Sequence, residues 1–449
     1  MKWEQLLSNK RLGQEKTAHR EDDRSEFQRD FDRLIFSAPF RRLQNKTQVF
    51  PLPGSIFVHN RLTHSLEVSS VGRSLGNDVS RLLLEKHPEL AKTHLTEMGS
   101  IVSAACLAHD LGNPPFGHSG ERAIGSYFSE GEGKKYETYF CDETDDSLTP
   151  EQWQDLIHFE GNANAFRLLT HHFIGRREGG FVMTYSTLAS IVKYPYASNQ
   201  AGKKGKFGFF QSEEADFQKI AHELGIKKLH TAEGERYARY PLVYLVEAAD
   251  DICYQIMDIE DAHKLKILTT EETRQLLISF FEEEKQTEIV ARLSTLDDVN
   301  EQIVYLRSIV IGLLENECVR VFVDNEESIL QGKFEGSLID HIGEKPREAY
   351  KNCVKTAVAK IYHAQMVVDI EIAGHKVITQ LLDLMLDAVT HTERTYSKIL
   401  INRVSSQYDI KAETLYERIL AVLDYISGMT DVFALDLYRK INGMSLATV

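Results

Sequence analysis

The densest group of residues able to do metal or acid–base chemistry lies in the segment 107–121, LAHDLGNPPFGHSGE. His109 and Asp110 are adjacent, and adjacent side chains on a helix point about 100° apart. Because Gly112 and Pro114-Pro115 follow, we expect a helix to end here, where a relaxed backbone lets both side chains turn toward one cation. A lone His-Asp pair is usually an ordinary surface or core pair, so its meaning depends on the rest of the chain.

Two further segments carry polar residues at helical spacing. Arg61 and His64 are three residues apart in HNRLTHSLEV, so both fall on one side of a helix. Acidic and aromatic residues share one helical stripe farther along, namely Glu247, Asp250, Tyr254, Asp258 and Asp261. A row of carboxylates repels itself unless a cation or a ligand compensates, although an ordinary amphipathic surface helix shows the same pattern.

The elements that must position these residues are helices. Apolar residues recur at three- and four-residue intervals over several long stretches, which are 62–84, 97–111, 301–322, 346–390 and 411–440. Pro241 opens a further predicted helix that runs to about Ala262. Alternating strand patterns are scarce, so the sequence predicts an all-α fold.

Two polar stretches, 129–150 and 195–212, read as loops. The second contains GKKGK, which lacks the spacing and the terminal Ser or Thr of a P-loop. Two interpretations stay open for it: a cradle for phosphate, or a mobile surface loop.

Composition limits the class of function. The 449 residues are 42% hydrophobic and carry a formal net charge of -15, which disfavours non-specific binding to nucleic acid. The five cysteines are scattered without a CxxC pair, so neither a disulfide framework nor a thiolate zinc site is predicted. No stretch approaches the roughly 20 apolar residues of a membrane span. We expect a cytoplasmic protein with reduced thiols and no membrane partner.

Several motifs together resemble a known family. RRLQNKTQVFPL, HNRLTHSLEV, AHDLGNPPFGHSGE, HFEGNA and EAADDICY occur in order between Arg41 and Asp261. They are similar to the deoxyguanosine triphosphate triphosphohydrolases of the HD superfamily and, more distantly, to the vertebrate dNTPase that joins a SAM domain to an HD domain. The resemblance implies an HD-domain helical core with additional C-terminal helices. We expect an N-terminal segment at 1–60 that contributes to the active site, a core at 61–262, and a helical region at 263–449 packed on it.

The resemblance also implies a metal site and a reaction. His64, His109, Asp110 and Asp250 match the H…HD…D signature of the superfamily. Their nitrogen and oxygen donors suit Mn²⁺, Mg²⁺, Fe²⁺ or Ni²⁺ better than a closed structural zinc site. The implied reaction is hydrolysis of a deoxynucleoside triphosphate at the α-phosphorus, with dGTP first, releasing a deoxynucleoside and tripolyphosphate.

Other family positions imply catalytic and substrate-binding roles. His118 and Glu121 correspond to an acid–base pair, in which we favour His118 as general acid and keep general base or nucleophile open. The matching substrate contacts are Arg61, Lys193 and Tyr254 for phosphate, Gln48 and Asp258 for the sugar 3′-hydroxyl, and His158 as a second active-site histidine. Asn113 departs from the pattern, because the vertebrate relative has a histidine there.

Two alternatives stay open. In a dinuclear HD phosphodiesterase or nucleotidase, His118 and His158 would bind a second ion. In a non-catalytic nucleotide sensor, the same residues would bind without turnover. A homo-oligomer, with a hexamer first, and a possible nucleotide activator are expected by analogy with the family.

Overall fold

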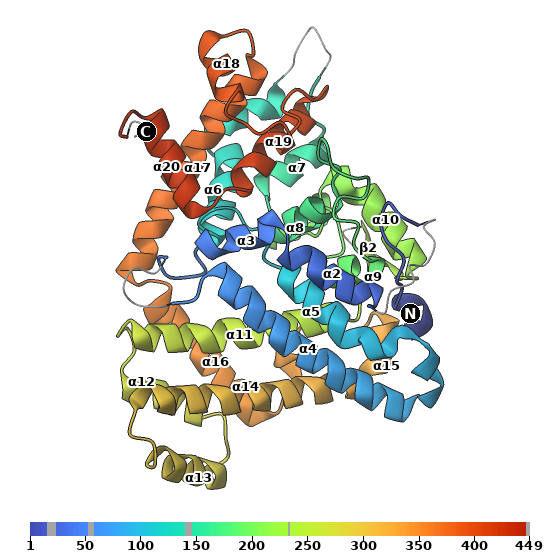
Figure 1. Ribbon diagram of the computed structural model, residues 1–449, viewed down its shortest axis with the longest axis vertical. Helices are drawn as coiled ribbons and strands as arrows, with labels where there is room; N and C mark the ends of the chain where they lie inside the picture. The colour runs from blue at the N-terminus through green and yellow to red at the C-terminus, as the bar shows by residue number, and fades with distance from the viewer. Residues whose placement is uncertain (16–23, 53–57, 140–145, 232–233, 446–449) are drawn as a thin grey trace.

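The computed structural model describes residues 1–15, 24–52, 58–139, 146–231 and 234–445. It is all-α, as the sequence predicts, apart from one small hairpin in the described residues (Figure 1). Strand β1 (Lys228–Thr231) pairs antiparallel with β2 (Gly234–Tyr237). Residues 140–145, which include Cys141 and part of one predicted loop, lie outside the described residues. The other four cysteines are free and buried.

The larger of two hydrophobic clusters is built around three helices, α4 (Arg61–Lys86), α5 (Met98–Ala108) and α11 (Val243–Lys264). The start of α4 is fixed by a capping box, in which the Asn60 side chain accepts the Thr63 N–H and Thr63 Oγ1 accepts the Asn60 N–H. A Cβ on Gly76 of α4 would lie 2.8 Å from the Cα of Gly99 in α5. Glycine is therefore what lets these two helices pack closely.

Further helices join the larger cluster. They are α1 (Trp3–Leu6), α2 (Glu26–Ile35), α9 (Tyr185–Ile191), α10 (Glu214–Glu223), α12 (Thr270–Ile278), α13 (Glu283–Leu293), α14 (Val299–Asp324), α15 (Glu326–Gln331) and α16 (Glu344–Thr356). In the described chain, no helix is both long and apolar enough to span a bilayer.

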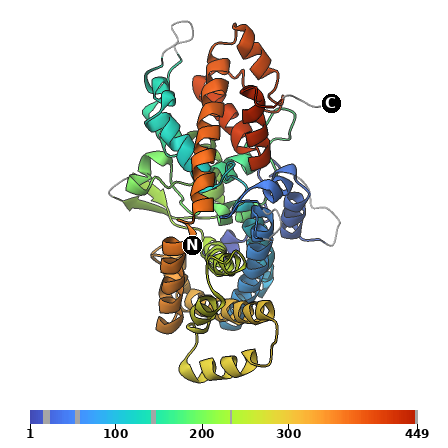
Figure 2. The same ribbon diagram turned by 90° about the vertical axis from the view of Figure 1, so that its left-hand side faces the viewer.

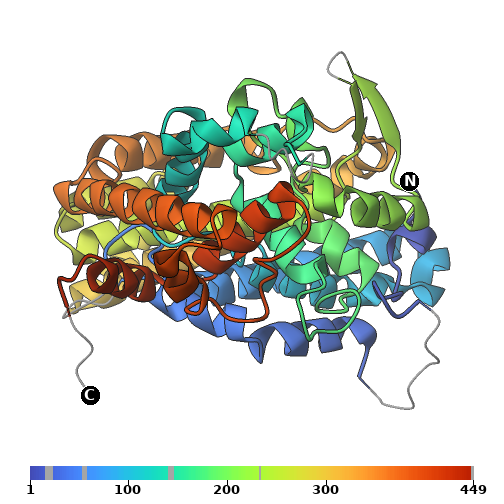
Figure 3. The same cartoon turned by 90° about the horizontal axis from the view of Figure 1, so that it is seen from above.

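The smaller cluster combines helices from the middle and the end of the chain. It contains α6 (His118–Ser129), α7 (Pro150–Ile157), α17 (Gln365–Thr390), α18 (Thr395–Ile401), α19 (Leu415–Ser427) and α20 (Asp431–Ile441). Figure 2 shows this group above the larger cluster, and Figure 3 shows α17 and α19 alongside each other. Residues distant in sequence, on α6 and α17, are thus brought into contact.

Helix α8 (Gly161–Thr170) has side chains in both clusters. Its Arg167 is buried and forms ion pairs with Glu213, at 2.6 Å, and with Asp424 of α19, at 2.8 Å. The short helix α3 (Ala38–Arg42) leads into the segment that carries Gln48. These polar contacts help to set the two clusters relative to each other.

The helix expected over 346–390 is interrupted. After α16 the chain forms a π-helical turn at Ala357–Ile361, and α17 begins only at Gln365. The interruption turns Tyr362 inward, where its hydroxyl donates a hydrogen bond to Asp258 Oδ2 at 2.9 Å. The helix expected over 411–440 is likewise divided, between α19 and α20.

Candidate metal centre and acid–base pair

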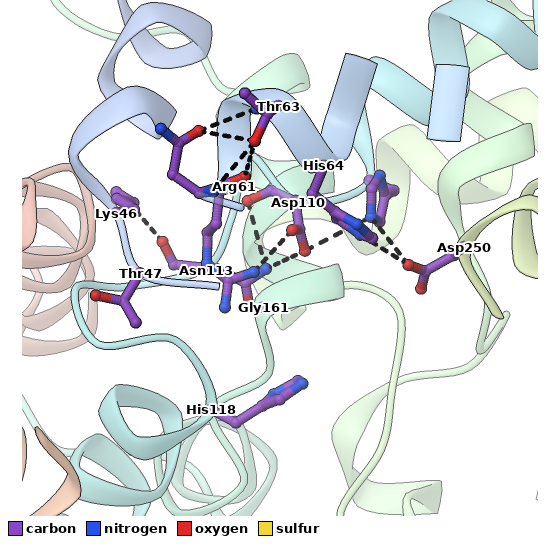
Figure 4. Close-up of polar contacts among 12 residues, drawn as sticks. Lys46, Thr47, Arg61, Thr63, His64, Asp110, Asn113, His118, Gly161 and Asp250 are labelled. Carbon is purple, nitrogen blue, oxygen red and sulfur yellow. Dashed lines mark hydrogen bonds and ion pairs between the residues drawn. The ribbon is translucent and has the colours of Figure 1, made fainter. Parts of the chain in front are cut away.

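Three helices of the larger cluster bring the predicted metal ligands together (Figure 4). His64 lies in the first turn of α4, His109 directly follows α5, and Asp250 lies on α11. Ligand atoms of these three residues all lie within 4.8 Å of one another. His64 Nε2 is 3.0 Å from Asp250 Oδ1, and His109 Nε2 is 3.5 Å from the same oxygen.

The fixed tautomer of His109 fits a cation. Its Nδ1 donates a hydrogen bond to the Cys106 carbonyl oxygen at 2.6 Å, which leaves Nε2 as the free donor atom. That Nε2 is buried and has no hydrogen-bond partner in the described chain, although Asp250 lies nearby. Buried polar atoms normally have a partner, and this nitrogen faces carboxylates without making a hydrogen bond. A divalent cation bound between them would supply the missing partner.

Asp110, the fourth predicted ligand, lies at the edge of this group. Its Oδ1 is 3.7 Å from His109 Nε2, while its Oδ2 accepts a hydrogen bond from Arg61 at 2.7 Å. Asn113 donates to the same carboxylate. Burial opposes ionisation of Asp110, but the Arg61 guanidinium holds its pKa below the usual value. Asp110 is therefore an anion that can bind a cation on one side and Arg61 on the other.

His118 and Glu121 form a pair at the start of α6. Figure 4 shows His118 set apart from the ligand group. His118 Nδ1 is 2.7 Å from Glu121 Oε2, and Glu121 Oε1 accepts the Gly161 N–H at 2.8 Å. The bond to Glu121 raises the pKa of His118 above its ordinary value. Burial opposes ionisation of Glu121, but its bond to His118 keeps the Glu121 pKa below the usual range. The pair can hold a proton on the imidazole.

A pocket of about 860 Å³ opens beside this pair. His118, Glu121 and the predicted His158 all line it. Lys206, from the GKKGK loop, also lines it, with Nζ 2.5 Å from Glu160 Oε2 and 4.0 Å from Glu121 Oε2. Burial, and then the Glu121 charge, raise the pKa of Glu160 to about 7. The loop whose role the sequence left open therefore brings a cation to the acid–base pair.

Two predicted phosphate contacts lie in different surroundings. Lys193 is held by Glu247, with its Nζ 3.0 Å from Glu247 Oε1, and Arg239 binds the other oxygen of that carboxylate. Tyr254 stands beside the metal group, with its ring centroid 6.3 Å from that of His64. Lys193 would have to share its charge between Glu247 and a ligand.

No hydrogen bond joins the two predicted sugar-binding residues in the described part of the chain. Asp258 is buried and accepts a hydrogen bond from Tyr362, and burial raises its pKa to about 8. Gln48 Oε1 is buried without a hydrogen-bond partner in the described residues. Tyr362, whose ring centroid lies 6.2 Å from that of Tyr254, was missed by the sequence reasoning because no motif marks it. Lys206 had only the weak signal of a Gly- and Lys-rich loop.

The sequence matches two known domain families. The model of the HD domain matches residues 61–193, and that of the phosphohydrolase-associated domain matches 342–440. The second match covers a region where no motif was found. Deoxyguanosinetriphosphate triphosphohydrolase-like proteins from Pseudomonas aeruginosa and Synechocystis sp. are each 38% identical, covering 99% of this chain and 99% and 100% of theirs.

A deoxyguanosinetriphosphate triphosphohydrolase from Cronobacter sakazakii is 31% identical over 92% of this chain and 93% of its own. These similarities extend over nearly the full length of this chain, which itself matches the HD domain. The chain therefore belongs to the deoxyguanosinetriphosphate triphosphohydrolase-like family of HD-domain phosphohydrolases.

Proposed function

We propose that this protein hydrolyses deoxynucleoside triphosphates, dGTP first, at the α-phosphorus, giving a deoxynucleoside and tripolyphosphate. The observation that carries the proposal is the position of Arg61. Its guanidinium donates to Asp110 and lies so close to Gly117 that a Cβ there would be 2.3 Å from its terminal nitrogen. Arg61 thus lies between the candidate ligand group and Gly117, the residue just before His118. Its positive charge is therefore placed where a phosphate could contact both the ligand group and His118.

The proposed ligands are His64, His109, Asp110 and Asp250. Their donor set suits Mn²⁺, Mg²⁺, Fe²⁺ or Ni²⁺. A cation bound there would polarise a phosphoryl oxygen as a Lewis acid. In the described residues, His64, His109 and Asp250 make up one such group of ligand atoms, which favours a mononuclear site over the dinuclear alternative.

The proposed role of His118 is to deliver a proton. Glu121 holds Nδ1, so Nε2 is the atom that can carry a proton into the pocket. The 5′-oxygen leaves as a strongly basic alkoxide, and protonation by a positioned acid lowers the barrier to its departure. Glu121 stabilises the charged imidazolium and fixes the ring.

Substrate recognition is assigned to the remaining predicted residues. Arg61 and Lys193 would neutralise phosphate oxygens, with Tyr254 donating a hydrogen bond. Gln48 and Asp258 would contact the 3′-hydroxyl, and the unpartnered Gln48 oxygen supports that assignment. His158 lines the pocket beside His118 and would contact the phosphates there.

The test is incubation of the protein with each of the four dNTPs and Mn²⁺, with all products resolved by ion-exchange chromatography. Tripolyphosphate and a deoxynucleoside are expected, and in ¹⁸O-water the label should enter tripolyphosphate. His118→Ala should abolish most turnover, while His230→Ala, on the exposed hairpin, should not. A nucleoside diphosphate product would contradict the proposed reaction.

The alternatives make different predictions. Two tightly bound ions per chain would favour the dinuclear phosphodiesterase, and binding of dNTPs without turnover would favour the sensor. A homohexamer, a nucleotide activator and a cytoplasmic location stay predictions. Light scattering of the purified chain, with and without dNTPs, tests the predicted homohexamer. The rate of turnover under the same conditions tests the predicted nucleotide activator.

A further inference from the structure

The turn that precedes His118 has an unfavourable backbone. Phe116 has φ +64° and Gly117 has φ +58°, and His118 follows directly as the first residue of α6. Positive φ is rare for a bulky residue such as phenylalanine and persists only when surrounding contacts stabilise it. The position of the imidazole therefore depends on whatever holds this turn.

One carboxylate from the end of the chain holds the turn. Asp431, the buried first residue of α20, accepts the Phe116 N–H on Oδ1 at 2.9 Å. Its Oδ2 accepts the Thr47 N–H at 2.8 Å. Thr47 directly precedes Gln48, so the two hydrogen bonds tie together the segments that carry the proposed acid and a proposed sugar contact.

Helices α17 and α19 contribute further contacts. The Phe116 ring lies against α17 at Gly374, where a Cβ would be 2.7 Å from Phe116 Cγ. The buried Lys46 donates one hydrogen bond to the Asn113 carbonyl oxygen, at 2.6 Å, and another to the Ser427 carbonyl oxygen at the end of α19, at 2.7 Å. Figure 4 shows Lys46 reaching Asn113 beside Thr47.

We infer that the C-terminal helices position the acid–base pair, with Asp431 and Gly374 as positioning residues for His118. Asp431 accepts hydrogen bonds from two backbone N–H groups, and the missing side chain of Gly374 leaves the space that the Phe116 ring occupies. The effect on turnover rests on the proposed function of His118. The effect on the turn itself does not.

The first test replaces Asp431 with asparagine. Asparagine keeps the size of the side chain, but its single oxygen can accept one N–H while its amide group faces the other. We expect kcat for dGTP with Mn²⁺ to fall about tenfold or more, because small displacements of a catalytic group are costly. KM and bound metal should change little. Asp436→Asn, on the same helix but only half-buried and paired with Lys440, is the matched control.

The second test removes no hydrogen bond. Gly374→Ala should displace the Phe116 ring and lower kcat in the same way. Gly312→Ala, in α14, is its control, because a Cβ there meets nothing within 4 Å. For both variants, hydrogen–deuterium exchange of peptides covering Thr47 and Phe116 should be faster than in the wild type, and exchange in α4 should be unchanged.

The outcomes separate the inference from the proposed function. Unchanged exchange around Phe116 together with unchanged kcat would overturn the inference, and so would a loss of metal in parallel with activity. If the wild type hydrolyses no dNTP, the proposed function fails. Faster hydrogen–deuterium exchange in the variants, confined to the segments around Thr47 and Phe116, would then still support the positioning of the turn. Exchange that shows no local increase in these two segments would overturn it.

Discussion

Replacing Glu121 with glutamine should reverse the hydrogen bond that orients His118. One carboxylate oxygen accepts the Gly161 N–H and the other faces His118 Nδ1. In Glu121→Gln the amide oxygen must stay on the Gly161 side, since a buried N–H without an acceptor is unfavourable. The amide NH₂ then faces Nδ1 as a donor. The imidazole can accept that bond only when Nδ1 carries no proton, so the imidazolium loses its support.

The size of the effect follows from the exposure of the pair. A hydrogen bond to a charged group stabilises by about 1.5–3 kcal/mol. The His118 side chain is 61% exposed, so solvent screens its charge and the lower end of this range applies. Since about 1.4 kcal/mol corresponds to one pKa unit, the pKa of His118 should fall by about one unit.

The assay is the pH dependence of kcat/KM for dGTP with Mn²⁺, which reports the free enzyme. Glu121 raises the pKa of His118, so the protonated acid is present below that pKa and is lost as pH rises through it. In Glu121→Gln the alkaline limb should therefore lie about one pH unit lower. Glu130→Gln removes a negative charge from the rim of the same pocket and should leave the limb in place. An unmoved limb, or one moved to higher pH, would refute the reasoning.

Three other changes test the metal group, the sugar site and the fold. Asp250→Ala should lose both bound metal and activity while staying helical, as measured by elemental analysis and circular dichroism; full metal content would remove Asp250 from the ligands. A 2′,3′-dideoxy substrate should turn over roughly 5- to 150-fold more slowly, because the Asp258 site would lack a partner worth about 1–3 kcal/mol; equal rates would contradict that site. Arg167→Met should lower the free energy of unfolding in urea by about 3–5 kcal/mol, because two buried carboxylates lose their cation. The exposed Arg394→Met should change it by less than about 1 kcal/mol, and similar losses in both variants would contradict the argument.

The sequence predicted those features that depend on local pattern. Helical periodicity identified α4, α5 and α11, and the motifs placed His64 on α4, His109 at the end of α5 and Asp250 on α11. The domain limits and the roles of the site residues stay predictions. Periodicity did not indicate the break after α16, because the residues on both sides of the π-helical turn keep helical spacing.

Contacts over long sequence separations were beyond local reasoning. Asp431 meets Phe116 across 315 residues, and Tyr362 meets Asp258 across 104. Nothing in the immediate neighbourhood of either residue distinguishes it from an ordinary helical aspartate or a core tyrosine. Lys206 was visible only as one lysine of a Gly- and Lys-rich loop, since its role depends on which pocket that loop covers.

The division of the apolar core has a consequence for heating. The candidate ligands lie on helices of the larger cluster, whereas His118 begins a helix of the smaller one. Between the clusters, Arg167 and Lys46 reach Asp424 and Ser427 of α19 through ion pairs and hydrogen bonds. Units joined in this way can open separately, with a free energy below that of global unfolding. The rate of turnover should therefore fall during warming at temperatures where the helical content is still unchanged. It should recover on cooling, when α6 and α19 pack against the larger cluster again.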